Sequence, residues 1–239
     1  MTAIIPAAGK GVRMQALTGG LPKELLPLGG KTVLGRIVEE AQTVAERVIV
    51  VSAPDKPEIE TWADENDVEL VYQYDRHGFA DAVACADVED DVVVLLGDCP
   101  YHGGSPLERM TNIVLRGIDG CIAVEEVSEE AMSRYGITEV NDWGGITNIL
   151  EKPKPDQTAS RWAIAARYAF SIRTMAQIQR VVAEQKSARP GQEVGLTEVI
   201  VTLIKEGADF KAAALQDGQR RADCGTPSEY EAAQRLRWN

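Results

Sequence analysis

Histidine and cysteine are scarce in this chain, and their placement excludes several kinds of chemistry. Of its 239 residues only 2 are histidine, His77 and His102, and no serine or cysteine nucleophile signature surrounds either one. The 4 cysteines lie far apart without a CxxC spacing, so neither a zinc site nor a disulfide framework is indicated. Catalysis by histidine is therefore not expected, and the cysteines suit a reduced cytosol.

Positive charge and long apolar runs are also in short supply. The chain has 25 basic and 37 acidic residues, a formal net charge of −12. Since nucleic acids and anionic membranes are bound by clustered lysine and arginine, neither partner is expected. No segment has the length needed to span a bilayer, and the N-terminus leads directly into a strand-like run, so we expect a cytoplasmic protein. A polyanionic ligand must then bind in a local basic pocket.

Strand-like runs alternate with helical patterns through the first half of the chain. β-Branched runs predict strands at residues 2–6, 47–52, 68–73 and 92–96. Apolar residues at helical spacing predict helices over 33–44 and 79–88. This alternation favours a Rossmann-like, three-layer α/β/α fold with a mixed, mostly parallel sheet, in which ligands bind at the carboxyl ends of the strands.

The second half carries a hairpin signal and two helix-start signals. Residues 135–152 are typical of a β-hairpin with its turn at 141–145, and residues 163–170 of a further strand. Capping-box patterns followed by proline predict helix starts at Ser105 and Thr226. Because no repeat or flexible linker is evident, these elements are expected to complete the same core.

The most informative segment runs from residue 4 to residue 27. An apolar strand leads into a loop of small residues, and two cations follow, Arg13 and Lys23. A dinucleotide fingerprint is excluded because Met14 stands where its third glycine is needed, and a P-loop ending at residues 30–32 would need glycine at Leu25. Backbone N–H groups could approach phosphate oxygens closely at the small residues, which are Ala7, Ala8, Gly9 and Gly11. The interpretations left are a nucleoside triphosphate cradle and an ordinary strand-to-helix turn.

Two aspartates occupy positions at which a metal ligand is chemically sensible. Asp98 ends the buried run 92–97, and Asp223 lies just before the helix start at Thr226. Mg²⁺ prefers oxygen donors and usually takes one or two protein carboxylates together with substrate phosphates. Each aspartate is therefore either a magnesium ligand or a loop or capping residue, and the pattern leaves both interpretations open.

Together these segments resemble the sugar-1-phosphate nucleotidylyltransferase family, over almost the whole chain. In that family an aspartate ending the fourth core strand and another in a late D-x-G-[ST] turn hold the metal, which implies Mg²⁺ on Asp98 and Asp223. The resemblance also implies a single domain over residues 1–239. Residues 1–127 would form its nucleotide-binding half, and residues 128–239 its sugar-binding half with the C-terminal helices.

Two motifs match the family's site for the sugar 1-phosphate. Glu151 and Lys152 belong to an EKP segment like the one that grips the sugar phosphate, where lysine suits a phosphate and a carboxylate suits hydroxyl groups. Tyr135 and Gly136 resemble the family's YG, whose glycine lets the sugar lie against the backbone. The resemblance implies that these four residues bind the sugar phosphate. For Glu151 and Lys152 the alternative is a solvated charge pair before a proline turn.

The pattern is closest to bacterial UTP:glucose-1-phosphate uridylyltransferases, the UDP-glucose pyrophosphorylases. It includes Pro22-Lys23-Glu24, where thymidylyl relatives more often have PKQ, and the runs at 163–168 and 192–200. The implied nucleotide-binding residues are Ala8, Gly9, Gly11, Glu24, Gln73 and Gly78. The alternatives are a dTTP-dependent enzyme and a non-catalytic sugar-nucleotide-binding protein on the same fold, and a homo-oligomer is possible for the family.

The resemblance implies transfer of a uridylyl group from UTP to glucose 1-phosphate with release of pyrophosphate. Arg13 would bind the β- and γ-phosphates, Lys23 the transferred phosphoryl group, and Lys152 the sugar phosphate. Three positions depart from the family pattern: Val12 replaces a threonine or serine, Asp81 a histidine and Arg161 an asparagine. These departures concern the identity of the sugar more than the type of reaction.

Overall fold

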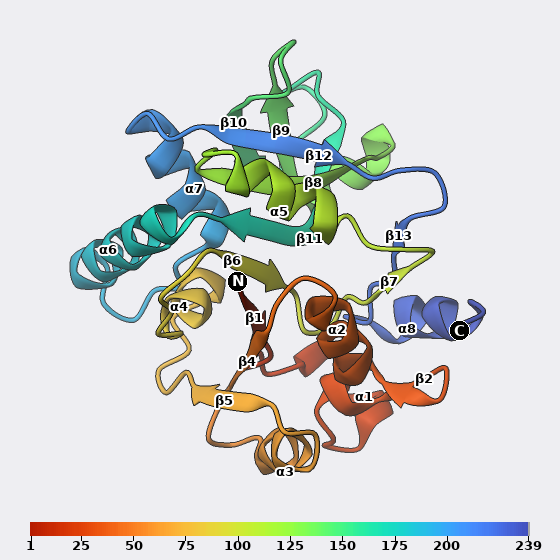
Figure 1. The fold of residues 1–239 in the computed structure, drawn as a ribbon. Helices are drawn as coiled ribbons and strands as arrows, with labels where there is room; N and C mark the ends of the chain where they lie inside the picture. Colours follow the sequence, from red (N-terminus) through yellow and green to blue (C-terminus); the bar gives the residue numbers. More distant parts are fainter. Residues whose placement is uncertain (239) are drawn as a thin grey trace.

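The computed structural model describes residues 1–238 and is built around a nine-stranded sheet (Figure 1). Its strands are β1 (Thr2–Pro6), β4 (Arg47–Ser52), β5 (Glu69–Tyr72), β6 (Val92–Leu95), β8 (Gly120–Glu126), β9 (Gly136–Val140), β10 (Ile146–Glu151), β11 (Trp162–Phe170) and β12 (Phe210–Ala214). The order is β10-β9-β11-β6-β1-β4-β5, with β8 paired to β11 and β12 paired to β8. The four strands predicted in the first half are confirmed, β1 and β4 with the predicted bounds.

Most strands of the sheet run in one direction. β1 is parallel to β4 and β6, β4 is parallel to β5, and β12 is parallel to β8. β11 is antiparallel to β6, β8 and β9, and β10 is antiparallel to β9, so only β10 and β11 oppose the others. The expected mixed, mostly parallel sheet is therefore confirmed, and it takes strands from both halves of the chain.

Helices cover both faces of the sheet. They are α1 (Gln15–Thr18), α2 (Val33–Gln42), α3 (Pro57–Glu65), α4 (Phe79–Ala84), α5 (Leu107–Leu115), α6 (Ile172–Ala188), α7 (Leu196–Lys205) and α8 (Pro227–Gln234). Because side chains alternate along a strand, Ile5 of β1 belongs to the core cluster that includes residues of α2, α5 and α8. Ile4 belongs to the cluster that includes residues of α4, α6 and α7. The three-layer α/β/α architecture is confirmed. No helix in the described part of the chain is long and apolar enough to cross a membrane.

Helices start near both predicted sites, but the first of them starts one residue later than its capping pattern predicts. Thr226 caps α8, since its Oγ1 accepts from the Glu229 N–H, and Pro227 is the first helical residue. α5 begins at Leu107, one residue after Pro106. The Ser105 hydroxyl oxygen accepts from the Leu107 N–H (3.2 Å), and the same hydroxyl donates to Glu40 Oε1 (2.6 Å). The Ser105 hydroxyl thus bonds to the start of α5 and to a carboxylate of α2 at the same time.

A buried ion pair joins strand β11 of the sheet to helix α2. Arg167 of β11 is fully buried and makes a bidentate pair with Glu40 of α2, through Nε (2.9 Å) and Nη2 (2.6 Å). Nη2 also donates to the carbonyl of Cys99 (2.9 Å). Because Cys99 follows Asp98 directly, this pair fixes the backbone that carries a predicted metal ligand.

Ala166 in β11 adopts a left-handed backbone conformation, with φ +61°, at a point where the register against β8 shifts. A left-handed conformation costs a residue with a Cβ about 1–2 kcal/mol, and glycine avoids this cost. We expect Ala166→Gly to destabilise the chain by about 1 kcal/mol less than Ala165→Gly, because Ala165 is also buried but lacks that conformation. Chemical denaturation of both variants measures the difference, and equal losses would show that the conformation carries no strain.

Candidate active site

Two adjoining cavities open at the carboxyl ends of β1 and β6. The loop cavity, of about 980 Å³, is lined by the small-residue loop after β1 and by the segments that follow β5 and β6. The hairpin cavity, of about 510 Å³, is lined by the β9–β10 hairpin and by residues of β11, α7 and the start of α8. The cavities share Arg13, Phe79, Leu96 and Lys152, so they meet along one common wall.

Every site residue predicted from the sequence lines one of these cavities. The loop cavity contains Asp98, Lys23 and all six predicted nucleotide-binding residues, which are Ala8, Gly9, Gly11, Glu24, Gln73 and Gly78. The hairpin cavity contains Asp223 and the predicted sugar-phosphate residues Tyr135, Gly136, Glu151 and Lys152. Arg13 and Lys152 line both cavities, which is where two reacting phosphates would have to meet. The roles assigned to these residues stay predictions.

The small-residue loop leaves β1 with the backbone geometry that its composition requires. Ala7 and Ala8 are buried, and Gly11 has φ +59°, a conformation that residues with a Cβ avoid. The short helix η1 (Val12–Met14) follows and places Arg13 at the boundary of the two cavities. The departure at Val12 leaves an exposed apolar side chain here, so a phosphate bound by this loop would meet backbone N–H groups in place of a hydroxyl.

Asp98 and Asp223 are brought together by a short antiparallel ladder. β7 (Tyr101–His102), just after Asp98, pairs with β13 (Arg220–Arg221), just before Asp223. The ladder continues from the Ala222 N–H to the Pro100 carbonyl (2.8 Å) and from the Cys224 N–H to the Asp98 carbonyl (2.9 Å). Two turns that are far apart in the sequence thus become neighbours.

The surroundings of these carboxylates suit a cation. Burial, followed by repulsion from Asp98, raises the pKa of Asp223. A methyl group added at Gly225 would lie 2.9 Å from Asp223 Oδ1, 3.2 Å from Arg13 Nη2 and 3.8 Å from Asp98 Oδ2, so the three charges surround one point. The described residues contain no cluster of three or more metal-ligating side chains. Two carboxylates completed by substrate phosphates are the donor set that Mg²⁺ commonly uses.

Lys23 lies directly against Asp98. The two side chains form an ion pair, and both are mostly buried. Burial alone would lower the pKa of Lys23, but attraction to Asp98, Glu24 and Asp223 outweighs it and the pKa is raised. Lys23 is therefore a permanently charged donor at the floor of the loop cavity.

Glu24 is held by a lysine that sequence reasoning missed. Lys56 Nζ lies 3.1 Å from Glu24 Oε2 and donates to the Ala7 carbonyl (2.6 Å), and both charged side chains are buried. Burial raises the pKa of Glu24 and lowers the pKa of Lys56, with each partner opposing the other's shift. The pair joins the small-residue loop to the helix η2 (Lys23–Leu25), and so positions Lys23.

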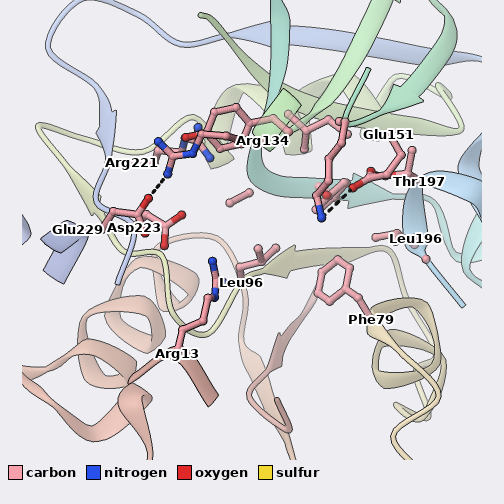
Figure 2. A pocket seen from close by; sticks show the side chains of 17 residues that line it. Arg13, Phe79, Leu96, Arg134, Glu151, Leu196, Thr197, Arg221, Asp223 and Glu229 are labelled. Carbon is pink, nitrogen blue, oxygen red and sulfur yellow. Dashed lines mark hydrogen bonds and ion pairs between the residues drawn. The ribbon is translucent and has the colours of Figure 1, made fainter. Parts of the chain in front are cut away.

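Tyr135 lies against two arginines that sequence reasoning also missed. The guanidinium carbon of Arg221 lies 4.0 Å from the Tyr135 ring centroid and that of Arg134 5.4 Å from it. Arg221 pairs with Glu125 and Arg134 with Glu229, so both guanidinium groups are held in place. Figure 2 shows Arg13 extending from the opposite wall toward Asp223 and Glu229. The hairpin cavity thus gathers cationic side chains from three parts of the chain.

Glu151 and Lys152 end the hairpin at the shared wall. Glu151 accepts a hydrogen bond from the Thr197 hydroxyl (3.0 Å), and Lys152 has a left-handed backbone, with φ +48°. The departure at Arg161 lies outside both cavities, where it pairs with Glu129 (2.8 Å). The departure at Asp81 has a buried carboxylate that accepts from Gln73 (2.7 Å). Arg161 therefore has no direct part in either cavity.

Comparisons with known proteins agree with this geometry. Residues 3–189 match the MobA-like NTP transferase domain. The UTP–glucose-1-phosphate uridylyltransferase AglF of Haloferax volcanii is 31% identical over 246 residues, covering 99% of this chain and 96% of that protein. The uridylyltransferase of the same name from Bacillus subtilis is 29% identical over 267 residues, covering 95% and 90%. A solved UDP-glucose pyrophosphorylase from Acinetobacter baumannii superposes with a TM-score of 0.81 at 25% identity, covering 98% and 91%.

Fold, cavities and comparisons define the chain as a nucleotidyltransferase. It belongs to the MobA-like NTP transferase family, whose domain spans most of its length. The resemblance to sugar-1-phosphate nucleotidylyltransferases, and among them to UDP-glucose pyrophosphorylases, is confirmed by the relatives and by the solved structures.

Proposed function

We propose that this enzyme transfers a uridylyl group from UTP to glucose 1-phosphate with Mg²⁺, producing UDP-glucose and pyrophosphate. The observation that carries the proposal is the pair of cavities with a common wall at Arg13 and Lys152. A nucleotide in the loop cavity and a sugar phosphate in the hairpin cavity would place their phosphates at that wall. Relatives named uridylyltransferases, and a solved pyrophosphorylase complexed with UDP-glucose at 25% identity, support uracil and glucose.

The reaction needs little acid–base chemistry from the protein. A phosphate oxygen of glucose 1-phosphate attacks the α-phosphorus of UTP, the bond from that phosphorus to the bridging oxygen breaks, and pyrophosphate leaves. Because the nucleophile is already anionic, the protein has to bring two polyanions together in line and to stabilise the charge that develops.

Each cation of the site has a task consistent with its position. Arg13, at the boundary of the cavities, binds the β- and γ-phosphates of the nucleotide. Lys23, at the floor of the loop cavity, binds the transferred phosphoryl group, and Lys152 orients the attacking sugar phosphate from the shared wall. Asp98 and Asp223 would hold Mg²⁺, which when bound neutralises charge on the phosphates.

Release of pyrophosphate from each nucleoside triphosphate against a panel of sugar 1-phosphates tests the proposal. We expect turnover to be fastest with UTP and glucose 1-phosphate and slower with dTTP. Uracil and thymine have the same hydrogen-bonding edge, so a 5-methyl group and a 2′-hydroxyl must discriminate, by about 1–3 kcal/mol. Equal or faster turnover with dTTP would assign the chain to the thymidylyl type. Nucleotide binding without turnover on any sugar phosphate would favour a sugar-nucleotide-binding protein instead.

A further inference from the structure

The amide of Gln73 is held in one orientation by its neighbours. Gln73 follows β5 at the carboxyl end of the sheet, is 3% exposed, and lines the loop cavity. Its Nε2 donates to the Gly78 carbonyl (2.9 Å) and to Asp81 Oδ2 (2.7 Å). A carbonyl and an ionised carboxylate only accept hydrogen bonds, so both amide hydrogens are used inside the protein. The carbonyl oxygen is the only polar atom of this side chain left to meet a ligand.

Gly78 is fixed in turn by its surroundings. It has φ +96°, and a Cβ at this position would lie 2.7 Å from the Val194 carbonyl oxygen. Only glycine fits such a conformation and such a close approach. The carbonyl that accepts from Gln73 therefore belongs to a backbone with little freedom to move.

Asp81 is kept ionised by a lysine from another helix. It is 5% exposed in the first turn of α4, and Lys186, in the last turn of α6, donates to its Oδ1 (2.6 Å). Burial alone would raise the pKa of Asp81, but the hydrogen bonds from Lys186 and Gln73 outweigh it and the pKa is lowered. Lys186 is itself partly exposed and lines neither cavity. It acts on a ligand only through Asp81 and Gln73.

We propose that the Asp81–Lys186 pair determines which pyrimidine the enzyme accepts, by presenting Gln73 to the base as a hydrogen-bond acceptor. The proposal rests on the function proposed above. Uracil has a single donor on its pairing edge, N3–H, and this is the atom an acceptor can bind. Cytosine placed in the same way turns the lone pair of its N3 toward the Gln73 carbonyl, and this repulsion excludes it. Asp81 and Lys186 are thus positioning residues for base selection.

Asp81→Asn tests the proposal because it keeps the size of the side chain and changes its hydrogen-bonding pattern. Lys186 only donates, so the oxygen of the new side-chain amide would face Lys186 and its NH₂ group would face Gln73. That NH₂ group opposes the present orientation of the Gln73 amide, which the Gly78 carbonyl alone would then support. We expect the ratio of kcat/KM for UTP to kcat/KM for CTP to fall at least tenfold. Affinities for UTP and CTP measured by calorimetry should converge in the same way, independently of turnover.

Two further variants keep the test decisive. Lys186→Met, at a partly exposed position, should lower the UTP to CTP ratio in the same direction by a smaller factor, even if Asp81→Asn folds poorly. Gln73→Leu removes the acceptor and should abolish most of the preference. The matched controls are Asp87→Asn and Lys205→Met, which make the same chemical changes at exposed positions outside both cavities and should leave the ratio at the wild-type value.

An unchanged UTP to CTP ratio in folded Asp81→Asn and Lys186→Met overturns the proposal. If the ratio changes in Gln73→Leu alone, Gln73 selects the base without help from the Asp81–Lys186 pair. An unchanged ratio in all three variants would point to Glu24 as the acceptor. These outcomes leave the proposed function intact if the wild type still makes UDP-glucose. A wild type that prefers CTP, or that does not turn over UTP, overturns both proposals at the first measurement.

Discussion

Asp98→Asn and Asp223→Asn are each expected to lower kcat at least about a hundredfold, equivalent to about 3 kcal/mol of lost transition-state stabilisation. The short ladder between β7 and β13 places both carboxylates beside Arg13 at the boundary of the two cavities. Asparagine keeps the shape of the side chain and removes the charge that a divalent cation needs. Pyrophosphate release at increasing Mg²⁺ concentration should show that each variant requires more metal than the wild type.

Asp217→Asn provides the matched control for this prediction. Asp217 is exposed in the loop between β12 and β13, shortly before Asp223, and lines neither cavity. The same change of charge there should leave both kcat and the magnesium requirement within about twofold of the wild type. Full activity of either site variant, or of wild-type protein treated with a chelator, would contradict a metal role for the two aspartates.

The sheet was predictable in its first half because local signals and tertiary contacts agree there. β1 and β4 are largely buried on both faces, so each has a continuous apolar run rich in β-branched residues. β8 was not predicted, although its first five residues are buried. It begins with glycine and ends with two glutamates, so the strand signal in the sequence is short. Its pairing with β11 and β12 forms the strand, and those contacts are remote in sequence.

The candidate site was predictable for the same reason, to the extent that its residues lie in short motifs. Small residues after a strand and aspartates at strand ends are local patterns, and the residues they pointed to all line the two cavities. Lys56, Arg221 and Lys186 have no such pattern around them. Each of them has its position fixed by an ion pair with a residue remote in sequence: Lys56 with Glu24, Arg221 with Glu125 and Lys186 with Asp81. A charged residue of this kind cannot be told from a surface charge until the fold places it.

Arg167 shows the same limit in the core. From the sequence it is one cation in a strand-like run, yet it is fully buried and binds Glu40 of α2. A buried guanidinium requires partners that satisfy its charge and its donors, and the packing of α2 against the sheet supplies the carboxylate. Arg167 also donates to the Cys99 carbonyl and so helps to fix the turn that carries Asp98. The position of Asp98 therefore depends partly on a contact that no local sequence motif predicts.

Lys23→Ala and Lys152→Ala are expected to damage different kinetic constants. Lys23 lies at the floor of the loop cavity, paired with Asp98, where charge changes during transfer, so its loss should lower kcat about a hundredfold. Lys152 lies at the shared wall, on the hairpin side, with an exposed side chain. Its loss should raise the KM for glucose 1-phosphate at least about tenfold and lower kcat by a smaller factor. Steady-state kinetics with each substrate varied in turn measures both effects.

The controls for this pair are Lys31→Ala and Lys154→Ala, which remove exposed lysines outside both cavities and should leave kcat and KM near the wild-type values. Combining Lys23→Ala with Asp98→Asn should cost less than the sum of the single effects, because the two side chains contact each other and each single variant leaves the other without its partner. Additive losses would mean that the ion pair has no part in catalysis. A Lys23 variant that mainly raises the KM for the sugar phosphate, together with a Lys152 variant that mainly lowers kcat, would reverse the roles assigned to the two lysines.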